Sequence, residues 1–122
     1  MESQEITRAQ KLDFRVGQVM THDVITVMSG TTLPELKEIL RTRRISGAPV
    51  VNEDGDLIGI ISIEDLLRAY QDGDFSAVVG ERMTTSLITV GEADSVGAAV
   101  QKFQQTGVGR LPVVNAWGQL VG

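Results

Sequence analysis

The sequence has no cysteine and a single histidine, His22. The lack of cysteine excludes disulfides, thiol catalysis and cysteine-based zinc or iron–sulfur sites, and one histidine excludes a polyhistidine metal site. Aromatic residues make up only 4% of the chain, so the core must be aliphatic. No apolar run approaches the ~18 residues of a membrane-spanning helix. The sequence therefore predicts a soluble protein without disulfides or a structural metal.

Positive charge is also scarce, with 11 basic residues against 16 acidic ones and a net charge of −5. Such a surface disfavours duplex nucleic acid as a partner, because the phosphate backbone requires a locally basic face. The first five residues are acidic and polar, unlike a secretory signal, so we expect a cytoplasmic location. The 122 residues suffice for one ordinary domain or for two small repeats that share a core.

The chain does contain an internal repeat. When Val16 is aligned with Val79, an offset of 63 residues, 14 of the 44 overlapping positions are identical without a gap. Chance would give roughly three identities at ordinary residue frequencies, so we infer a duplication. The matched segments are Val16–Thr21 with Val79–Thr84, Ile25–Val27 with Ile88–Val90, Pro49–Asn52 with Pro112–Asn115, and Gly55, Leu57 and Gly59 with Gly118, Leu120 and Gly122.

The repeat defines the expected domain organisation. We expect an N-terminal arm or linker over residues 1–15, repeat 1 over 16–71, a linker over 72–78 and a truncated repeat 2 over 79–122. Repeat 2 stops at the partner of Gly59, so the segment that follows Gly59 in repeat 1 has no counterpart. Because a chain seldom ends within an apolar strand, we expect a fragment of a longer protein.

Repeat 1 predicts a strand, a helix, a hairpin and a second helix. The β-branched residues 24–27 indicate a short strand, and Thr32 with Glu35 forms a capping box that begins a helix. Two apolar runs around a turn at Glu53–Gly55 predict a hairpin, after which Ser62 begins the second helix. The side chains expected to face inward are Leu33, Leu36, Ile39 and Leu40 on the first helix and Leu66, Leu67 and Tyr70 on the second.

Repeat 2 predicts the same order: a strand over 87–90, a helix from Asp94 or Ser95, a strand over 111–114 and a strand from Leu120. The side chains expected to face inward on its helix are Val96, Ala99, Val100 and Phe103. The predicted fold class is α+β, with two strand–helix–strand–strand–helix repeats packed with pseudo-twofold symmetry and the second repeat incomplete. One such repeat leaves its sheet face uncovered, and two can bury these faces against each other.

The passage from strand to helix at Ser62 carries the clearest chemical signal. A helix N-terminus directs backbone N–H groups and the positive end of its dipole at whatever lies above the strand. Ser62 would there hydrogen-bond a phosphate, and Asp65 would accept from two vicinal hydroxyls, as a carboxylate does from a ribose. The same Ser-x-x-Asp spacing is also an approximate capping box, so the residues alone leave a structural role open.

The run Arg41-Thr42-Arg43-Arg44 is the only dense basic cluster in the chain. It suits a solvated helix C-terminus, where cations offset the dipole, and equally a clamp for phosphate. We interpret His22 as a loop residue and the calcium-loop-like Asn52–Asp56 as a hairpin turn, because the twelve-residue spacing with a terminal glutamate is missing. No P-loop, dinucleotide-binding motif or nucleophile–base pair is present, so we expect no catalytic activity.

Together these motifs resemble the cystathionine beta-synthase (CBS) domain. They are the Val-Met-Thr opening, the Ile-Thr-Val strand, the Pro-Val-Val-Asn-x-x-Gly-x-Leu-x-Gly hairpin and the Gly-Ile-Ile-Ser-x-x-Asp ending, and the resemblance covers residues 16–122. CBS domains nearly always occur in tandem, as a Bateman module. The resemblance implies a regulatory module that binds adenosine nucleotides in clefts between repeats and adjusts a neighbouring domain of a larger protein.

The resemblance also implies site residues. In the family's motif the aspartate holds the ribose hydroxyls and the Ser or Thr lies near the phosphates, which matches Asp65 and Ser62. The other matching positions are Ala48 at a base-contacting position, Val24 and Ile25 in the wall of the adenine pocket, and Arg44 where some members carry a phosphate-binding basic residue. The second Ser/Thr-x-x-Asp would lie beyond Gly122, so a second site of this type cannot form in this chain.

The expected function is a sensor that binds AMP, ADP, ATP or S-adenosylmethionine, catalyses nothing and uses no cofactor. The ligand would hold the two repeats in one arrangement. It would bias a partner only to the extent that the affinity of the ligand differs between two states of the module. The alternative is a ligand-free CBS pair that serves as a scaffold for dimerisation. In either case we expect a homodimer. The candidate contact surface is Leu33, Leu36 and Leu40 with Val96, Ala99 and Phe103.

Overall fold

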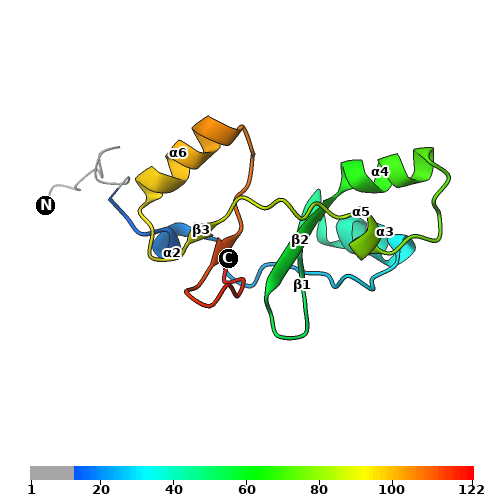
Figure 1. Ribbon diagram of the computed structural model, residues 1–122, viewed down its shortest axis with the longest axis horizontal. Coiled ribbons are helices and arrows are strands. Elements are labelled where there is room, and N and C mark those ends of the chain that lie inside the picture. The colour runs from blue at the N-terminus through cyan, green and yellow to red at the C-terminus, as the bar shows by residue number, and fades with distance from the viewer. Residues whose placement is uncertain (1–12) are drawn as a thin grey trace, which may run out of the picture. The chain divides into compact units, whose positions relative to one another are not determined.

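The structure, a computed structural model, describes residues 13–122, and the arm or linker expected over residues 1–15 lies almost entirely outside this range. Internal contacts group the described residues into two units, and most of their elements are labelled in Figure 1. Unit 2 comprises residues 24–87 and 118–120, and unit 1 comprises residues 13–23, 88–117 and 121–122. Both units combine helices with strands, in agreement with the predicted α+β class.

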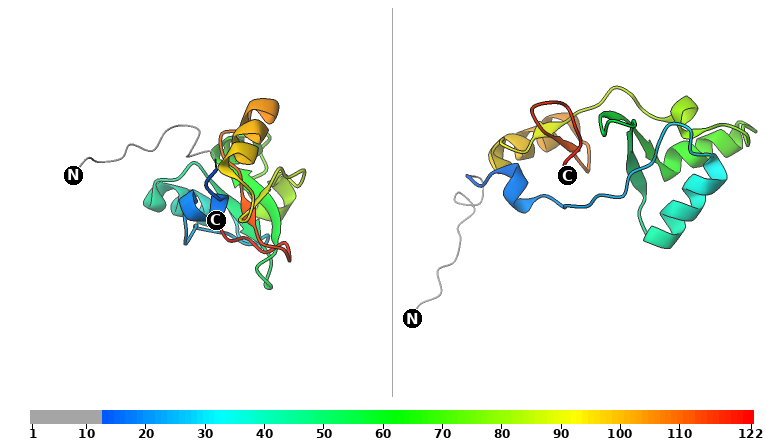
Figure 2. Two further views of the ribbon diagram at one scale, coloured as in Figure 1. Left: turned by 90° about the vertical axis from the view of Figure 1, so that its left-hand side faces the viewer. Right: turned by 90° about the horizontal axis from the view of Figure 1, so that it is seen from below.

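Unit 2 contains a two-stranded antiparallel hairpin and three helices. In chain order they are α3 (Leu33–Arg43), β1 (Gly47–Val51), β2 (Leu57–Ser62), α4 (Ile63–Gln71) and α5 (Val79–Arg82). Helices α3 and α4 lie on the same side of the hairpin (Figures 1 and 2). The order helix–hairpin–helix is the one that the sequence predicts for repeat 1.

The predicted hairpin and its turn are confirmed. Asn52 Oδ1 accepts hydrogen bonds from the backbone N–H groups of Asp54 and Asp56, each at 3.0 Å. Gly55 has a φ of +82°, a left-handed conformation that glycine adopts without steric cost. The segment that looks like a calcium loop is therefore an Asx-type hairpin turn. The register pairs Gly47 with Ser62, Ala48 with Ile61, Pro49 with Ile60 and Val50 with Gly59.

Both long helices of unit 2 begin at predicted capping boxes. Thr32 Oγ1 accepts from the N–H of Glu35 at 3.2 Å, and Glu35 Oε2 accepts from the N–H of Thr32 at 3.1 Å. Ser62 and Asp65 form the same reciprocal arrangement at the start of α4. Helix α3 ends at Arg43, and the next residue, Arg44, is its C-cap with a left-handed φ of +54°. The hydrogen bonds of the two capping boxes satisfy N–H groups that a helix start would otherwise leave unpaired.

The core of unit 2 is aliphatic, as the composition predicts. Leu33 and Leu36 of α3 are fully buried together with Val50 and Ile61 of the hairpin, and Leu40 is nearly so. The apolar face of α3 is thus used inside the unit. These leucines do not supply the contact surface between copies that the sequence suggested.

Two expectations for repeat 1 are wrong in detail. Residues 24–27 do not form a strand: only Val27 pairs, in a single parallel bridge with Val50, so the extended segment meets β1 at one position. Leu67 does not face inward and is 54% exposed. The buried stripe of α4 runs through Leu66 and Ala69, and neighbouring helical residues point about 100° apart, so Leu67 falls outside it.

Unit 1 has shorter strands than unit 2, whereas its longest helix is as long as α3. Its elements are α2 (Val16–Val19), β3 (Val90–Gly91), α6 (Val96–Thr106) and β4 (Val113–Val114). Strands β3 and β4 pair in parallel through Val90 and Val113, and Ser95 caps α6, one of the two predicted starting residues. The core consists of Val16, Val90, Ala99 and Val113.

Unit 1 departs from the predicted pattern at three places. The strands expected over 87–90 and 111–114 shrink to two residues each. The strand expected from Leu120 is not formed, although the N–H of Val121 donates to the carbonyl of Val113 at 2.8 Å. Phe103 does not face inward but is 36% exposed. All three reflect a small core with few neighbours to pair or pack against.

The opening segment of each repeat packs in the unit formed by the other repeat. In unit 2 the N–H of Gly80, from repeat 2, donates to the carbonyl of Ser29 at 2.8 Å. In unit 1 the N–H of Gly17, from repeat 1, donates to the carbonyl of Glu92 at 2.9 Å. An added Cβ would lie 3.0 Å from Ser29 Cβ at Gly80 and 3.2 Å from Glu92 O at Gly17, so both contacts suit glycine.

An ion-pair cluster fixes the segment between α4 and α5. Arg82 donates to Asp72 at 2.8 Å and to Asp74 at 3.0 and 3.1 Å. The hydrogen bonds from Asp72 and then Asp74 raise the pKa of the Arg82 guanidinium. Arg82 therefore ties the start of repeat 2 to the end of repeat 1 within unit 2.

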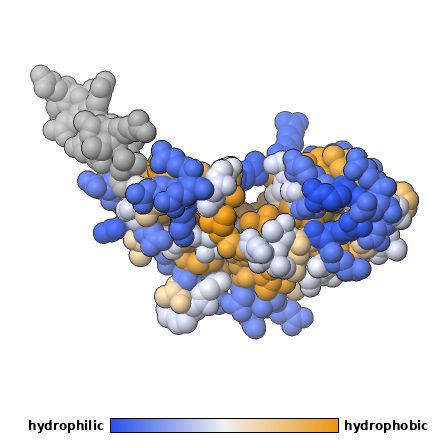
Figure 3. Space-filling model, turned by 45° about the horizontal axis from the view of Figure 1, so that its top comes forward, coloured by the Kyte–Doolittle hydropathy of each residue, from blue (hydrophilic) through white to orange (hydrophobic). Residues whose placement is uncertain are grey.

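The surface drawn in Figure 3 alternates hydrophilic and hydrophobic areas. The large hydrophobic side chains that remain exposed are Val19, Met28, Ile63, Leu67, Phe75, Phe103 and Trp117. Within residues 13–122, no helix has the length and apolar character needed to cross a membrane.

Candidate functional site

The site predicted from the sequence lies where β2 passes into α4. Ser62 is the last residue of β2 and the N-cap of α4. Its pairing partner Gly47 begins β1, and the N–H of Ile63 donates to the carbonyl of Ser46 at 2.8 Å. The start of α4 is thereby anchored to the loop that precedes β1.

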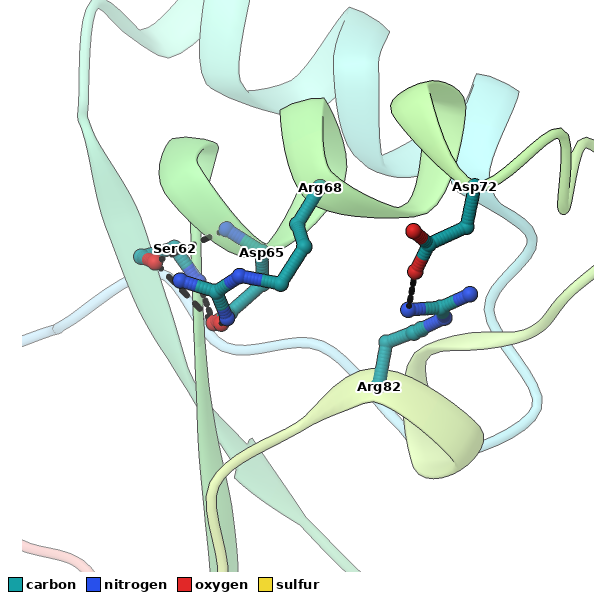
Figure 4. Close-up of polar contacts among 5 residues, drawn as sticks. All are labelled: Ser62, Asp65, Arg68, Asp72 and Arg82. Atoms are coloured by element: carbon teal, nitrogen blue, oxygen red, sulfur yellow. Dashed lines mark hydrogen bonds and ion pairs between the residues drawn. The ribbon is translucent and has the colours of Figure 1, made fainter.

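Ser62 and Asp65 contact each other directly, as Figure 4 shows. Ser62 Oγ accepts from the N–H of Asp65 at 3.3 Å and donates to Asp65 Oδ2 at 3.0 Å. Asp65 Oδ2 also accepts from the N–H of Ser62 at 2.9 Å. Of the two roles that the sequence left open, the capping box is present, and the ligand role of these two residues stays a prediction.

The other oxygen of Asp65 faces a basic residue that the sequence analysis did not single out. Arg68 Nη1 lies 3.4 Å from Asp65 Oδ1. The Asp65 side chain is 12% exposed, whereas that of Arg68 is 65% exposed, so the pair joins a sheltered carboxylate to an exposed surface cation. The Asp-x-x-Arg spacing, typical of helical ion pairs, is the signal that predicts this contact.

The predicted base-contacting residues occupy mixed environments. Ala48 is buried in β1 opposite Ile61, so its side chain belongs to the core and only its backbone remains for a ligand. Val24 and Ile25 are half-buried and lie shortly before Val27, whose N–H donates to the carbonyl of Pro49 at 3.0 Å. The structure therefore brings Val24 and Ile25, the predicted wall of the adenine pocket, close to the start of β1. It does not by itself establish a base pocket.

Arg44 is exposed at the C-terminus of α3, two residues before Ser46, whose carbonyl binds the N–H of Ile63. The backbone therefore places Arg44 two residues from this contact with the start of α4, and its phosphate-binding role stays a prediction. Arg41 instead pairs with Glu38 at 2.8 Å. This hydrogen bond and the positive charge of Arg41 lower the pKa of Glu38. The basic cluster therefore divides between a surface ion pair and Arg44.

Metal chemistry finds no support in residues 13–122, where no three His, Cys, Asp or Glu side chains gather in a way that could hold an ion. His22 lies exposed in a loop, as predicted. The geometry therefore offers a helix N-terminus, a carboxylate and one arginine, Arg68, beside that carboxylate, which suit a ligand with hydroxyl and phosphate groups.

Comparison with known proteins agrees with the sequence motifs. A family model for the CBS domain matches residues 16–72 and, separately, residues 78–122. Inosine-5'-monophosphate dehydrogenase from Aquifex aeolicus is 32% identical over 122 residues, which is 99% of this chain and 24% of that protein. The chain thus spans about a quarter of the length of this relative.

Solved structures are similar along most of the chain. One is CBSX2, a CBS-pair protein from Arabidopsis thaliana that was solved in complex with AMP. It is 30% identical to this chain, with a TM-score of 0.79, and the match covers 89% of this chain and 87% of CBSX2. The CBS domain pair of protein MJ0100 in complex with 5'-methylthioadenosine and S-adenosyl-L-methionine is 28% identical, with a TM-score of 0.79 and coverage of 89% and 86%. With two family matches and this likeness, the chain belongs to the CBS domain family and contains a tandem pair of CBS domains.

Proposed function

We propose that the chain is a regulatory module that binds an adenosine nucleotide or an adenosyl ligand at the start of α4 and thereby controls a neighbouring domain or partner. The carrying observation is the contact between Ser62 and Asp65 at the N-terminus of a helix. Arg44 lies two residues before Ser46, whose carbonyl accepts from the N–H of Ile63 in the same helix. The ligands of the similar CBS pairs, AMP and S-adenosyl-L-methionine with 5'-methylthioadenosine, support an adenosine-containing ligand.

The ribose and the phosphate of such a ligand each have a chemical counterpart in unit 2. The ribose hydroxyls would donate to the Asp65 carboxylate. A phosphate would accept from Arg44 and, when the Ser62 hydroxyl turns away from Asp65 Oδ2, from Ser62. Catalysis is not part of the proposal, because the similarity to the dehydrogenase covers only 24% of that enzyme. Regulation follows if the ligand has different affinities for two states of the larger protein.

Calorimetry with AMP, ATP and S-adenosylmethionine tests the proposal. Asp65→Ala removes charge-assisted hydrogen bonds worth about 1.5–3 kcal/mol each, so the affinity should fall at least roughly tenfold. Glu35→Ala is the matched control, because Glu35 has the same capping role at the start of α3. We expect both variants to lose similar stability and only Asp65→Ala to lose binding.

Unchanged affinity in folded Asp65→Ala would overturn the ribose role and leave the capping box as the function of this residue. A wild-type protein that binds none of the three ligands would favour the second candidate, a ligand-free scaffold for dimerisation. Two observations support that candidate: the capping box already engages both Ser62 and Asp65, and Ile63 and Leu67 of α4 are exposed.

Sedimentation at micromolar concentration tests the scaffold. If the exposed face of α4 joins two copies, Leu67→Glu should convert a dimer into a 13.2 kDa monomer, because it places a charge in an apolar contact. Val19→Glu is the matched control, since Val19 is exposed to a similar degree but lies in unit 1. A wild-type monomer would contradict self-association.

A further inference from the structure

The hydrogen-bond capacity of Asp65 is limited and largely used. An ionised carboxylate offers about four acceptor positions, two on each oxygen. Oδ2 accepts from the N–H and from the Oγ–H of Ser62, at 2.9 and 3.0 Å, so both of its positions are occupied. Oδ1 faces Arg68 Nη1 at 3.4 Å, which leaves one position on this oxygen.

A vicinal diol needs two acceptor positions, one for each hydroxyl. We infer that Arg68 determines specificity at this site: it occupies the Asp65 Oδ1 position that the second hydroxyl needs, and must leave it before a diol is fully bound. The inference rests on the proposed function, because it assumes that a ribose binds at Asp65. Arg68 would act on Asp65 and need not contact the ligand.

The surroundings of the two partners explain why Arg68 is the group that leaves. Ser62 is fixed by the backbone, since it ends β2 and pairs with Gly47, and its hydroxyl also accepts from the N–H of Asp65. Arg68 is held to Oδ1 by a single long contact, and 65% of its side chain is exposed. Figure 4 shows its side chain lying back along α4 toward Ser62 and Asp65. Releasing it to water costs less than breaking the cap.

The test compares adenosine with 2'-deoxyadenosine, which keeps only one hydroxyl of the vicinal 2',3' pair and therefore needs only the free position. Calorimetry is done on the wild type, Arg68→Gln and Arg68→Lys, with Lys37→Gln as the control that removes one exposed positive charge from α3. Arg68→Gln should raise the affinity for adenosine about two- to fivefold, as expected for loss of an exposed ion pair. The affinity for 2'-deoxyadenosine should stay unchanged.

Arg68→Lys keeps a cation able to reach the carboxylate and should behave like the wild type, as should Lys37→Gln. An equal gain for both nucleosides in Arg68→Gln would indicate a general charge effect and overturn the inference. A loss of adenosine affinity would overturn it too, because Arg68 would then assist binding. If the wild type binds adenosine but the ratio between the two nucleosides does not change, the inference fails while the proposed function stands. If the wild type binds neither adenosine nor AMP, the proposed function is wrong, and the inference is wrong with it.

Discussion

Helices α3 and α6 begin and end at equivalent residues of the two repeats, yet they are buried to different depths. Leu36 and Leu40 of α3 are 0% and 4% exposed, whereas their partners Ala99 and Phe103 of α6 are 8% and 36% exposed. In unit 2, α4 packs beside α3. In the described part of unit 1, no helix occupies that place beside α6. The comparison teaches that burial depends on a neighbouring element as well as on the apolar pattern.

The largest effect that tests this comparison concerns the aligned pair Leu40 and Phe103. Leu40→Ala should lower the free energy of unfolding by about 2–5 kcal/mol, because it leaves a cavity in a closed core. Phe103→Ala should cost less than Leu40→Ala, because 36% of Phe103 is already exposed to water. Urea denaturation measures both. Equal losses would show that unit 1 buries this position more deeply than the structure indicates.

A smaller effect concerns Gly59, which faces the opening segment of repeat 2. A Cβ at Gly59 would lie 2.5 Å from Met83 Sδ and 3.1 Å from the carbonyl oxygen of Thr84, so Gly59→Ala should cost about 1–3 kcal/mol. Adding Met83→Ala should recover part of that loss. Gly122, the aligned residue, faces Met20 and Thr21 in the same way.

Gly122→Ala should cost a similar amount, because a Cβ there would meet Met20 and Thr21 just as a Cβ at Gly59 would meet Met83 and Thr84. Thermal unfolding of the three variants provides the comparison. A neutral Gly59→Ala would contradict the close packing of the opening segment of repeat 2 against β2.

The smallest effect concerns the exposed pair of Glu38 and Arg41, whose aligned residues on α6 are Gln101 and Gln104. Arg41 lowers the pKa of Glu38 in the folded protein. The stability from this pair is therefore present above the unfolded pKa of Glu38 and is lost as pH falls through the folded one. Glu38→Gln should be slightly less stable than the wild type at pH 7, and the difference should vanish in acid. A difference that grows as pH falls would contradict the lowered pKa.

Local spacing made several parts of the structure predictable. The capping boxes at Thr32 and Ser62 and the turn at Gly55 depend on residues within four positions of each other, so the sequence contains all of the information. The contact between Ser62 and Asp65 follows from the same spacing. The strand expected over 24–27 failed, because a strand needs a partner that local residue types do not supply.

By itself, the sequence determined the duplication, the helix starts, the hairpin and the family, since each depends on short-range patterns repeated at an offset of 63 residues. Only the tertiary structure decided that the opening segment of each repeat packs in the other repeat's unit, that Ala48 turns its side chain into the core, and that α3 is covered while α6 is not. These outcomes depend on contacts between residues far apart in the chain. Such contacts are decided by which backbone groups and apolar surfaces are left unsatisfied once the local elements have formed.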